Sequence, residues 1–369
     1  MKLLIIARPF VFHGGVERAT VGLVTALVEH GYDVHLLSLR GQAPVRGVTL
    51  HTLWLPPLPS AARVLALAMN ARLAVRRGTW DVVQSHERTL CQDVYRAGEG
   101  CHRAYLASLE RPRARGLYHR IVLALERRVF ARTPSIVAIA DAGRREIETL
   151  YGVAPERVTV VYNGVDLERF HPLNRTKYRE TARAEAGIAP GAFTVLFVGS
   201  GFARKGLATT IAAFAAFSDR ESRLVVLGRG DAQEYRSGAA RLGVGERIAW
   251  LGARADPERW YAAADIVVLP SRYEPFGNVH LEALASGVPV VASASAGGAE
   301  VIADGINGAV VNPTDVAGIT AALERFRDRS ADDVARAARR SAEPFTYAAQ
   351  VGGFARIYSR FTHATCDFP

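Results

Sequence analysis

Short, mostly apolar runs recur along this chain, and each is followed by a glycine-containing loop and then by a helical pattern. Such runs occupy Leu3–Ala7, Phe193–Val198, Ile266–Pro270 and Val288–Ala292. The other strand candidates are Asp33–Leu39, Val48–Leu53, Asp81–Gln84, Ser135–Ala140, Val158–Tyr162, Arg223–Leu227 and Arg247–Leu251. A run of this kind is typical of a strand that is buried on both faces, because helices cover both sides of a parallel sheet. The alternation of these strands with helices predicts a doubly wound α/β fold with parallel sheets.

The length of the chain predicts two domains. A chain of 369 residues exceeds what a single hydrophobic core usually organises. The alternation of strands and helices is interrupted by the turn-forming residues of Asn163–Pro172, where we place a hinge. We therefore expect a first domain at residues 1–165, a second at residues 166–345, and a final helix within residues 346–369.

The cysteines and the apolar runs indicate a chain that folds in a reducing compartment. Cys91, Cys101 and Cys366 are too few for a disulfide framework, and their spacing fits no metal site. The first apolar run ends before Arg8 and is therefore too short for a signal peptide. No apolar run is long enough for a membrane-spanning helix. We expect a protein that is soluble in the cytoplasm or peripheral to a membrane.

Positive charge is concentrated in the first half of the chain. Residues 1–165 hold 22 Lys and Arg against 13 Asp and Glu, whereas residues 166–369 hold 24 against 23. Within Cys101–Arg132, eight arginines alternate with apolar residues at helical spacing. This basic amphipathic pattern suits an anionic membrane surface, and because no nucleic-acid-binding motif accompanies it we do not expect nucleic acid as a partner. A solvated arginine-rich helix is the alternative interpretation.

The stretch Ser271–Ala283 carries the strongest functional signal. Pro275 and Gly277 favour a tight turn from a strand into a helix, so that backbone amides can point outward at the positive end of that helix. These amides belong to Phe276, Gly277, Asn278 and Val279, and a phosphate fits there. Glu274 and Glu282 bracket the turn; since carboxylates repel a phosphate, they suit hydrogen bonds from hydroxyls of a sugar or ribose. The plain alternatives are a solvated loop glutamate and a first-turn glutamate favoured by the helix dipole.

Two further loops have the composition of anion sites. Gly14 and Gly15 follow the first strand and open a helix at Val16–Glu29, without the spacing of a dinucleotide-binding loop. Arg204 and Lys205 lie in a glycine-bounded loop after another strand, where a guanidinium fork and an ammonium could hold a phosphate. Taken alone, this pair of cations fits a solvated loop as well as it fits a phosphate site.

Several of these motifs occur together, in this order, in a known enzyme family. Gly14–Arg18, Asn163–Asp166 and Arg204–Gly206, together with the two glutamates, make the whole chain resemble the retaining nucleotide-sugar glycosyltransferases of family 4. The resemblance implies the GT-B fold, in which two Rossmann-like, doubly wound α/β domains face a central cleft and a final helix crosses back to the first domain. Within the family, Asp93–Cys101, the basic stretch after it and Phe202–Gly206 are similar to the lipopolysaccharide core glucosyltransferases.

The resemblance also implies roles for individual residues. Glu274 would accept hydrogen bonds from the donor-sugar hydroxyls, and Glu282 would hold the ribose. Arg204 and Lys205 would neutralise the leaving diphosphate. Glu99 falls on the acceptor side, where it would act on the acceptor hydroxyl or stabilise positive charge on the sugar. A purely structural role for Glu99 fits the sequence equally well. The other substrate-binding residues expected are Gly14, Gly15, Arg169, Gly201, Arg254, Phe276, Gly277, Asn278 and Val279. No Asp-x-Asp motif occurs in the chain, so we expect neither a metal nor another cofactor.

The function implied is transfer of a hexose, with glucose as the first choice, from a UDP-sugar to a membrane-associated glycolipid such as the lipopolysaccharide core. We expect a monomer that is peripheral to the inner face of the cytoplasmic membrane. Other family 4 transferases, which build exopolysaccharide or O-antigen from other donors, remain open, since Ala19 and Pro275–Phe276 depart from the core glucosyltransferase pattern. A UDP-N-acetylglucosamine 2-epimerase of GT-B fold and a non-enzymatic membrane-binding module are alternatives from other classes.

Overall fold

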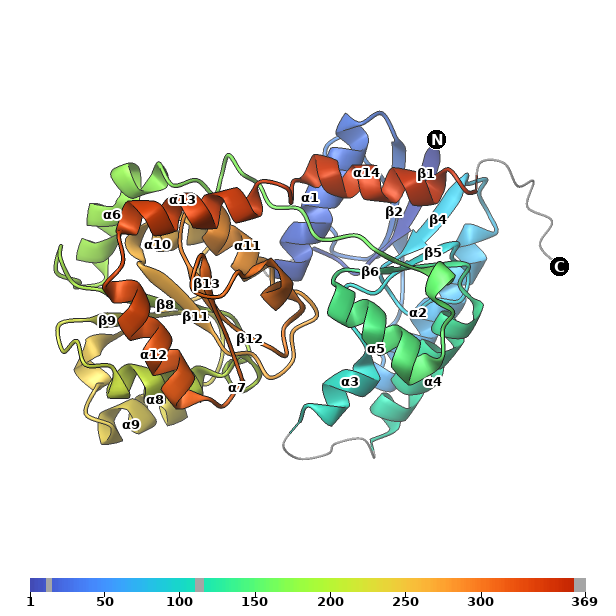
Figure 1. The fold of residues 1–369 in the computed structure, drawn as a ribbon. Coiled ribbons are helices and arrows are strands. Elements are labelled where there is room, and N and C mark those ends of the chain that lie inside the picture. Colours follow the sequence, from blue (N-terminus) through green and yellow to red (C-terminus); the bar gives the residue numbers. More distant parts are fainter. Residues whose placement is uncertain (11–14, 110–115, 362–369) are drawn as a thin grey trace. The chain divides into compact units, whose positions relative to one another are not determined.

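The computed structural model describes residues 1–10, 15–109 and 116–361, and it divides into two compact units (Figure 1). The first unit contains Met1–Gly164 together with the helix that begins at Tyr347, and the second contains Val165–Thr346. The chain therefore passes from one unit to the other at Gly164 and returns after Thr346. Gly14, residues 110–115 of the basic stretch, and Cys366 lie outside the described residues.

The first unit is built on a parallel sheet of seven strands in the order β3-β2-β1-β4-β5-β6-β7. The strands are β1 (Lys2–Ile6), β2 (Asp33–Leu39), β3 (Thr49–Leu53), β4 (Val82–Ser85), β5 (Val94–Arg96), β6 (Ser135–Ala138) and β7 (Val158–Val160). Leu3 of β1 pairs with Val34 on one side and with Val82 on the other. The strand order reverses between β1 and β4, which is the switch point where ligands bind in folds of this kind.

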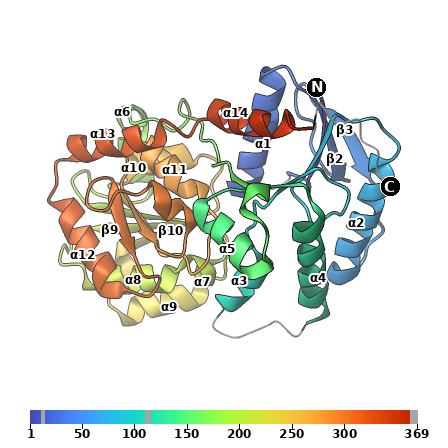
Figure 2. The same ribbon diagram turned by 45° about the vertical axis from the view of Figure 1, so that its right-hand side comes forward.

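Side chains of β1 point alternately to the two faces of this sheet, and helices bury both faces. Leu3 and Ile5 belong to a core that α1 (Gly15–Glu29) and α14 (Tyr347–Tyr358) cover, while Leu4 and Ile6 belong to a second core with α2 (Ser60–Val75). The remaining helices of the unit are α3 (His102–Ala107), α4 (Leu117–Arg132), α5 (Asp141–Tyr151) and the short η1 (Pro155–Arg157). In Figure 2, α2 and α4 lie side by side, and they are in contact.

The second unit repeats this plan with a parallel sheet of six strands in the order β10-β9-β8-β11-β12-β13. The strands are β8 (Thr194–Val198), β9 (Arg223–Leu227), β10 (Ile248–Gly252), β11 (Ile266–Leu269), β12 (Val290–Ser293) and β13 (Gly308–Val311). The helices are α6 (Asn174–Glu185), α7 (Phe202–Lys205), α8 (Leu207–Ala216), α9 (Gln233–Arg241), α10 (Pro257–Ala263), α11 (Asn278–Ala285), α12 (Val316–Arg327) and α13 (Ala331–Ala342), with η2 (Gly245–Arg247) and η3 (Gly297–Val301). Here the strand order reverses between β8 and β11.

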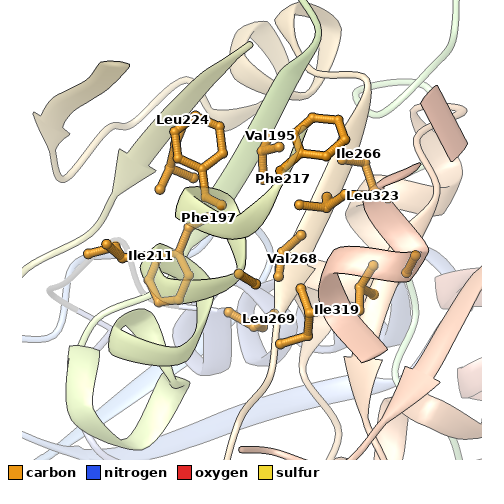
Figure 3. Close-up of a cluster of buried hydrophobic side chains, with 14 of the residues drawn as sticks. Val195, Phe197, Ile211, Phe217, Leu224, Ile266, Val268, Leu269, Ile319 and Leu323 are labelled. Atoms are coloured by element: carbon orange, nitrogen blue, oxygen red, sulfur yellow. The ribbon is translucent and has the colours of Figure 1, made fainter. Parts of the chain in front are cut away.

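One core of the second unit lies between its sheet and the helices α8 and α12. Figure 3 shows Phe197 of β8 and Val268 of β11 packed with Ile211 of α8 and Ile319 of α12. All four side chains are buried. Removing this much apolar surface from water fixes the central strands, and with them the loops that leave their carboxyl ends.

The two parallel α/β units confirm the doubly wound fold class that the sequence predicts. Two strands were not predicted, namely β5 (Val94–Arg96) and β13 (Gly308–Val311). β5 has only three residues, of which the last is an arginine, and β13 is an edge strand that begins with glycine. Neither resembles the longer apolar runs of the central strands.

The basic stretch Cys101–Arg132 forms two helices rather than one continuous surface. Its described parts are α3 and α4, and the apolar residues Val122, Leu125, Val129 and Phe130 of α4 are buried. Most of the apolar stripe that suggested a membrane surface is therefore used by the core of the first unit. Leu117 and Tyr118 at the start of α4 and the arginines of this helix remain exposed. Among the described residues, no helix is long and apolar enough to cross a membrane.

Candidate functional site

Lys205 and Glu274 come together because they follow the two strands at the switch point of the second sheet. β8 leads through Gly199 into α7, which ends at Lys205, and β11 leads through Pro270 into the loop that carries Glu274. β8 and β11 are parallel neighbours, so both loops leave from the same edge of the sheet. Residues 69 positions apart in the chain thereby meet at the expected place for a ligand.

Two cations hold the carboxylate of Glu274. The ammonium of Lys205 forms an ion pair with it, and Arg204 donates to Glu274 Oε2 at 3.0 Å and to the carbonyl of Tyr273 at 2.8 Å. Lys205 is 7% exposed. We call Arg204, Lys205 and Glu274 the second-unit cluster. With two cations and one carboxylate it has an excess of one positive charge, which an anionic group such as a phosphate would balance.

The charge state of Glu274 follows from these contacts. Burial would raise its pKa, but the neighbouring Lys205 and Arg204 outweigh burial and lower the pKa to about 2. The carboxylate is therefore ionised at neutral pH. It can accept hydrogen bonds from hydroxyls, but it holds no proton to donate.

Glycines allow the loops around this cluster to approach each other. A Cβ on Gly206 would lie 2.3 Å from the carbonyl oxygen of Pro270, and Gly206 has a φ of +77°. A Cβ on Gly228 would lie 2.0 Å from the carbonyl oxygen of Gly199. Gly201, an expected substrate-binding residue, has a φ of +75° and stands immediately before α7. The backbone is therefore packed closely at the point where the cations emerge.

The turn after Glu274 delivers the amino end of α11, as the sequence predicts. Gly277 has a φ of +88° and precedes Asn278, the first residue of the helix. Phe276 is buried, and its carbonyl accepts a hydrogen bond from Gly298 N at 2.7 Å, which fixes the turn. The first amides of a helix have no partner within it, and they lie at the positive end of its dipole. Phe276, Gly277, Asn278 and Val279 thus lie at the amino end of α11, in the loop and first turn that follow Glu274.

Glu282 lies on α11 beyond its first turn, so the interpretation as a first-turn glutamate is wrong. Its side chain is buried, and Oε2 accepts a hydrogen bond from the hydroxyl of Tyr261 at 2.8 Å. Tyr261 is fully buried as well and belongs to α10. A buried carboxylate that a tyrosine orients in this way suits the recognition of hydroxyl groups.

His280 is a residue of this site that the sequence did not single out. It is fully buried on α11, and its Nδ1 lies 3.1 Å from the carbonyl of Phe276. Burial lowers the pKa of His280 to about 4, so the ring is neutral and Nδ1 carries the proton. Nε2 has no hydrogen-bond partner among the described residues. Only its place between the two glutamates could have drawn attention to it, since a lone histidine on a helix is more often a core residue.

Arg169 and Arg254 were expected to bind substrate, and the structure places both beside the loop between β10 and α10. Arg169 donates to Glu258 at 2.9 and 3.0 Å and to the carbonyl of Ala255. Arg254 pairs with Glu185, and its guanidinium lies 5.2 Å from the ring centroid of Trp260. Among the described residues, neither arginine forms a hydrogen bond or ion pair with the second-unit cluster. Gly15, also expected in the site, is the first residue of α1 in the other unit.

Glu99 belongs to a charged cluster at the switch point of the first sheet. Its carboxylate lies 2.9 Å from Arg8, which follows β1, and 3.3 Å from Arg88, which follows β4. Arg8 also pairs with Glu87 at 2.8 Å, and Arg88 pairs with the fully buried Glu126 at 3.0 Å. We call Arg8, Glu87, Arg88, Glu99 and Glu126 the first-unit cluster.

The first-unit cluster has three carboxylates for two arginines, so its excess charge is negative. Burial would raise the pKa of Glu99, but Arg8 and Arg88 outweigh burial and lower it. Glu99 is therefore ionised, which makes it a weak base and a good partner for a hydroxyl or for positive charge. Of this cluster the sequence singled out Glu99 alone, because the other members come from three other parts of the chain.

Two family models match the chain, one in each half. The model described as "Glycosyltransferase Family 4" matches residues 13–169, and the model described as "Glycosyl transferases group 1" matches residues 192–328. A Burkholderia thailandensis protein named as a probable transglycosylase is 30% identical over 316 residues, which cover 85% of this chain and 83% of the relative. A D-inositol 3-phosphate glycosyltransferase of Catenulispora acidiphila is 35% identical, over 61% of this chain and only 56% of the relative.

Solved structures resemble the whole described fold. A crystal structure of WaaG, a glycosyltransferase involved in lipopolysaccharide biosynthesis, matches with a TM-score of 0.83 at 23% identity and covers 99% of this chain and 100% of its own. HepE from Anabaena in complex with UDP-glucose matches with a TM-score of 0.78 at 19% identity, over 98% of this chain and 100% of its own. At these identities the likeness concerns the fold. Since the Burkholderia relative spans most of both chains and the family models match both halves, the chain belongs to the family 4 glycosyltransferases and has the GT-B fold.

Proposed function

We propose that this glycosyltransferase moves a hexose, with glucose as the first candidate, from a UDP-sugar to a membrane-associated glycolipid such as the lipopolysaccharide core. The configuration at the transferred carbon is retained, as in the family that the sequence resembles. The enzyme acts at the inner face of the cytoplasmic membrane. The observation that carries the donor part of this proposal is the excess positive charge of the second-unit cluster at a topological switch point.

Departure of the nucleoside diphosphate is the step that this cluster serves. When the bond between the sugar carbon and the phosphate oxygen breaks, negative charge develops on the leaving diphosphate. Arg204, Lys205 and the amides at the start of α11 stabilise that charge with groups that are already in place. We propose that the cations do this without a metal, and a chelator in the assay tests that part of the proposal.

The two glutamates of the second unit recognise hydroxyl groups of the donor. Glu274 is ionised and accepts hydrogen bonds from the sugar, while Glu282, oriented by Tyr261, accepts them from the ribose. The first unit contributes Glu99, which is ionised between two arginines and acts on the acceptor side.

The comparisons support the choice of donor and acceptor without deciding either. HepE was solved with UDP-glucose, and WaaG is described as acting in lipopolysaccharide biosynthesis. The Catenulispora relative, by contrast, is named for a soluble acceptor, D-inositol 3-phosphate. Both kinds of acceptor therefore belong in the test.

The test measures turnover of labelled UDP-glucose, UDP-galactose, UDP-N-acetylglucosamine and GDP-mannose, each with and without acceptor. Acceptors are a lipopolysaccharide inner core in vesicles and D-inositol 3-phosphate in solution. We expect transfer from UDP-glucose to the glycolipid and no sugar conversion without an acceptor. Conversion of UDP-N-acetylglucosamine without acceptor would indicate an epimerase. Transfer to D-inositol 3-phosphate but not to the glycolipid would mean that the acceptor is the inositol phosphate. Binding without turnover of any donor would indicate a non-enzymatic module.

A further inference from the structure

The helix α2 of the first unit presents large apolar side chains to solvent. Leu65, Met69 and Leu73 are 39%, 69% and 54% exposed, and Trp54 in the preceding loop is 66% exposed. The three helical residues are spaced four apart, so they share one side of α2. These four residues fall within a single segment of 20 positions. Among the described residues, the other exposed large apolar side chains include the pair Leu117 and Tyr118 at the start of α4, and the rest are scattered along the chain.

The arrangement of α2 is the reverse of that in an ordinary surface helix. Its fully buried residues are the small Ala68 and Ala71, and its large apolar residues Leu65, Met69 and Leu73 are exposed, while Val64, Leu67 and Val75 are half-buried. Ordinary surface helices bury the large apolar face and expose the polar one. Leaving a leucine or methionine in water forfeits the free energy that its burial would give, so this outward stripe indicates a surface that something covers.

The charge around this stripe identifies what covers it. Between Asp33 and Asp81 the chain contains six arginines and neither Asp nor Glu. Four of these arginines are on α2 or just after it, namely Arg63, Arg72, Arg76 and Arg77, and all four are exposed. Because Arg72 and Arg76 lie on the same side as Leu65 and Met69, the covering partner must be both apolar and anionic.

A second copy of this chain does not meet that requirement. In a symmetric dimer the same patch would meet itself, so Arg72 and Arg76 would face their own copies, with no carboxylate between residues 34 and 80 to neutralise them. A bilayer of anionic phospholipids meets the requirement for a partner that is both apolar and anionic. Its acyl chains can surround the apolar side chains, and its headgroup phosphates can pair with the arginines. Trp54 suits the boundary between the two, where tryptophan is enriched.

We propose that the α2 surface, formed by Trp54, Leu65, Met69, Leu73, Arg72 and Arg76, docks the first unit on an anionic membrane. This assigns membrane contact to a segment other than Cys101–Arg132, where the apolar residues of α4 from Val122 to Phe130 are largely buried and, of its large apolar residues, only Leu117 and Tyr118 are exposed. The proposal names the surface with which the enzyme would approach a membrane-bound acceptor. It rests on the proposed function only in assuming that the acceptor is bound to a membrane.

The test is co-sedimentation of the full chain with vesicles of phosphatidylcholine, with and without about one third phosphatidylglycerol. The variant L65S/M69S/L73S changes exposed side chains only, so the fold should be kept. We expect its affinity for the anionic vesicles to fall at least about tenfold. The matched control, L173S/L242S/I306S, removes three exposed apolar side chains from the second unit and should bind like wild type. R72Q and R76Q should each weaken binding about fivefold.

Two further readouts separate this inference from the proposed function. UDP titration by calorimetry should be the same in all these variants, since none touches the second-unit cluster. Tryptophan emission should shift to the blue on adding anionic vesicles, and Trp54→Phe should abolish that shift. Loss of UDP binding or turnover with vesicle binding intact would overturn the proposed function alone.

Equal vesicle binding by L65S/M69S/L73S and wild type would overturn the α2 surface, as would no binding by wild type. Equal binding of wild type to neutral and anionic vesicles would overturn the role of the arginines. If the triple variant lost a dimer that wild type forms in solution but kept its vesicle binding, the α2 surface would be a contact with a second copy of the chain rather than with a membrane.

Discussion

The two charged clusters occupy equivalent places in their sheets but carry opposite excess charge. Each stands at the carboxyl ends of the two strands between which the strand order reverses. The second-unit cluster sets two cations against one carboxylate, and the first-unit cluster sets two arginines against three carboxylates. Topology marks both places as ligand sites. The balance of charge then distinguishes them, because only the second cluster needs an anion to become neutral.

Each cluster holds one buried cation and one more exposed cation. The side chains of Lys205 and Arg88 are 9% and 11% exposed, whereas those of Arg204 and Arg8 are 34% and 49% exposed. Burial therefore does not distinguish the clusters, but their excess charge does. Because only the second-unit cluster can balance the charge of a diphosphate, we expect changes there to have the larger effects on transfer.

Replacing Lys205 by methionine should give the largest effect. The change leaves Arg204 and Glu274 with no excess positive charge, so charge on the leaving diphosphate loses a fixed partner. We expect kcat/KM to fall about 100- to 1000-fold, measured as sugar transfer. Lys177→Met, which removes an exposed lysine of the same unit, is the control and should stay near wild type. A Lys205→Met enzyme with nearly full activity would refute the role of the second-unit cluster.

Glu282→Gln should weaken donor binding by about 10- to 100-fold, the usual loss for a hydrogen bond to a charged group. Glutamine keeps an oxygen for the hydroxyl of Tyr261, so the fold around α11 should persist. Calorimetric titration with UDP measures the change. Glu234→Gln, at the start of α9, removes an exposed glutamate and serves as the control. Unchanged affinity in Glu282→Gln would leave the carboxylate a structural role only.

Glu274→Gln should change the way stability depends on pH. The folded pKa of about 2 lies below the ordinary value of 4.5, so the ion pairs stabilise the protein fully above pH 4.5 and lose that effect as the pH falls toward 2. The advantage of wild type over the variant should shrink by about 1.4 kcal/mol for each pH unit below 4.5. Urea unfolding of both proteins between about pH 6 and pH 3 measures this. A difference that does not vary with pH would mean that Glu274 is not held by its cations.

Glu99→Gln should have the smallest effect of the four. The first-unit cluster still has Glu87 and Glu126 to pair with its two arginines, so the change removes the excess negative charge and leaves no cation unpaired. We expect kcat/KM for transfer to fall less than about tenfold, with the affinity for UDP unchanged. A loss of UDP affinity equal to that of Lys205→Met would break the distinction between the clusters.

The sequence predicts the central architecture and singles out the three residues of the second-unit cluster, but it does not reveal the first-unit cluster. Runs such as Phe193–Val198 mark buried strands, and the turn at Gly277 marks the start of α11, because these signals are local. The first-unit cluster is not local, since Arg8 and Glu87 are 79 positions apart and meet only through the order of the strands. Composition could not have paired them.

The basic stretch shows a second limit. Helical periodicity reveals that α4 has an apolar side, but it does not reveal what covers that side, and in the structure the core of the first unit covers most of it. In α2 the large Leu65, Met69 and Leu73 are exposed while the small Ala68 and Ala71 are buried, which no rule of periodicity would choose. The exposed fraction of each side chain is a property of the fold, so it was available only from the structure.

The most direct test of the account compares the affinities of UDP and uridine in three proteins by calorimetry. Wild type should bind UDP at least about 100-fold more tightly than uridine, because the diphosphate contributes charge-assisted contacts. Lys205→Met should lose most of this ratio, and Arg8→Met in the first-unit cluster should keep it. A ratio that survives Lys205→Met but collapses in Arg8→Met would contradict the assignment of the diphosphate to the second unit.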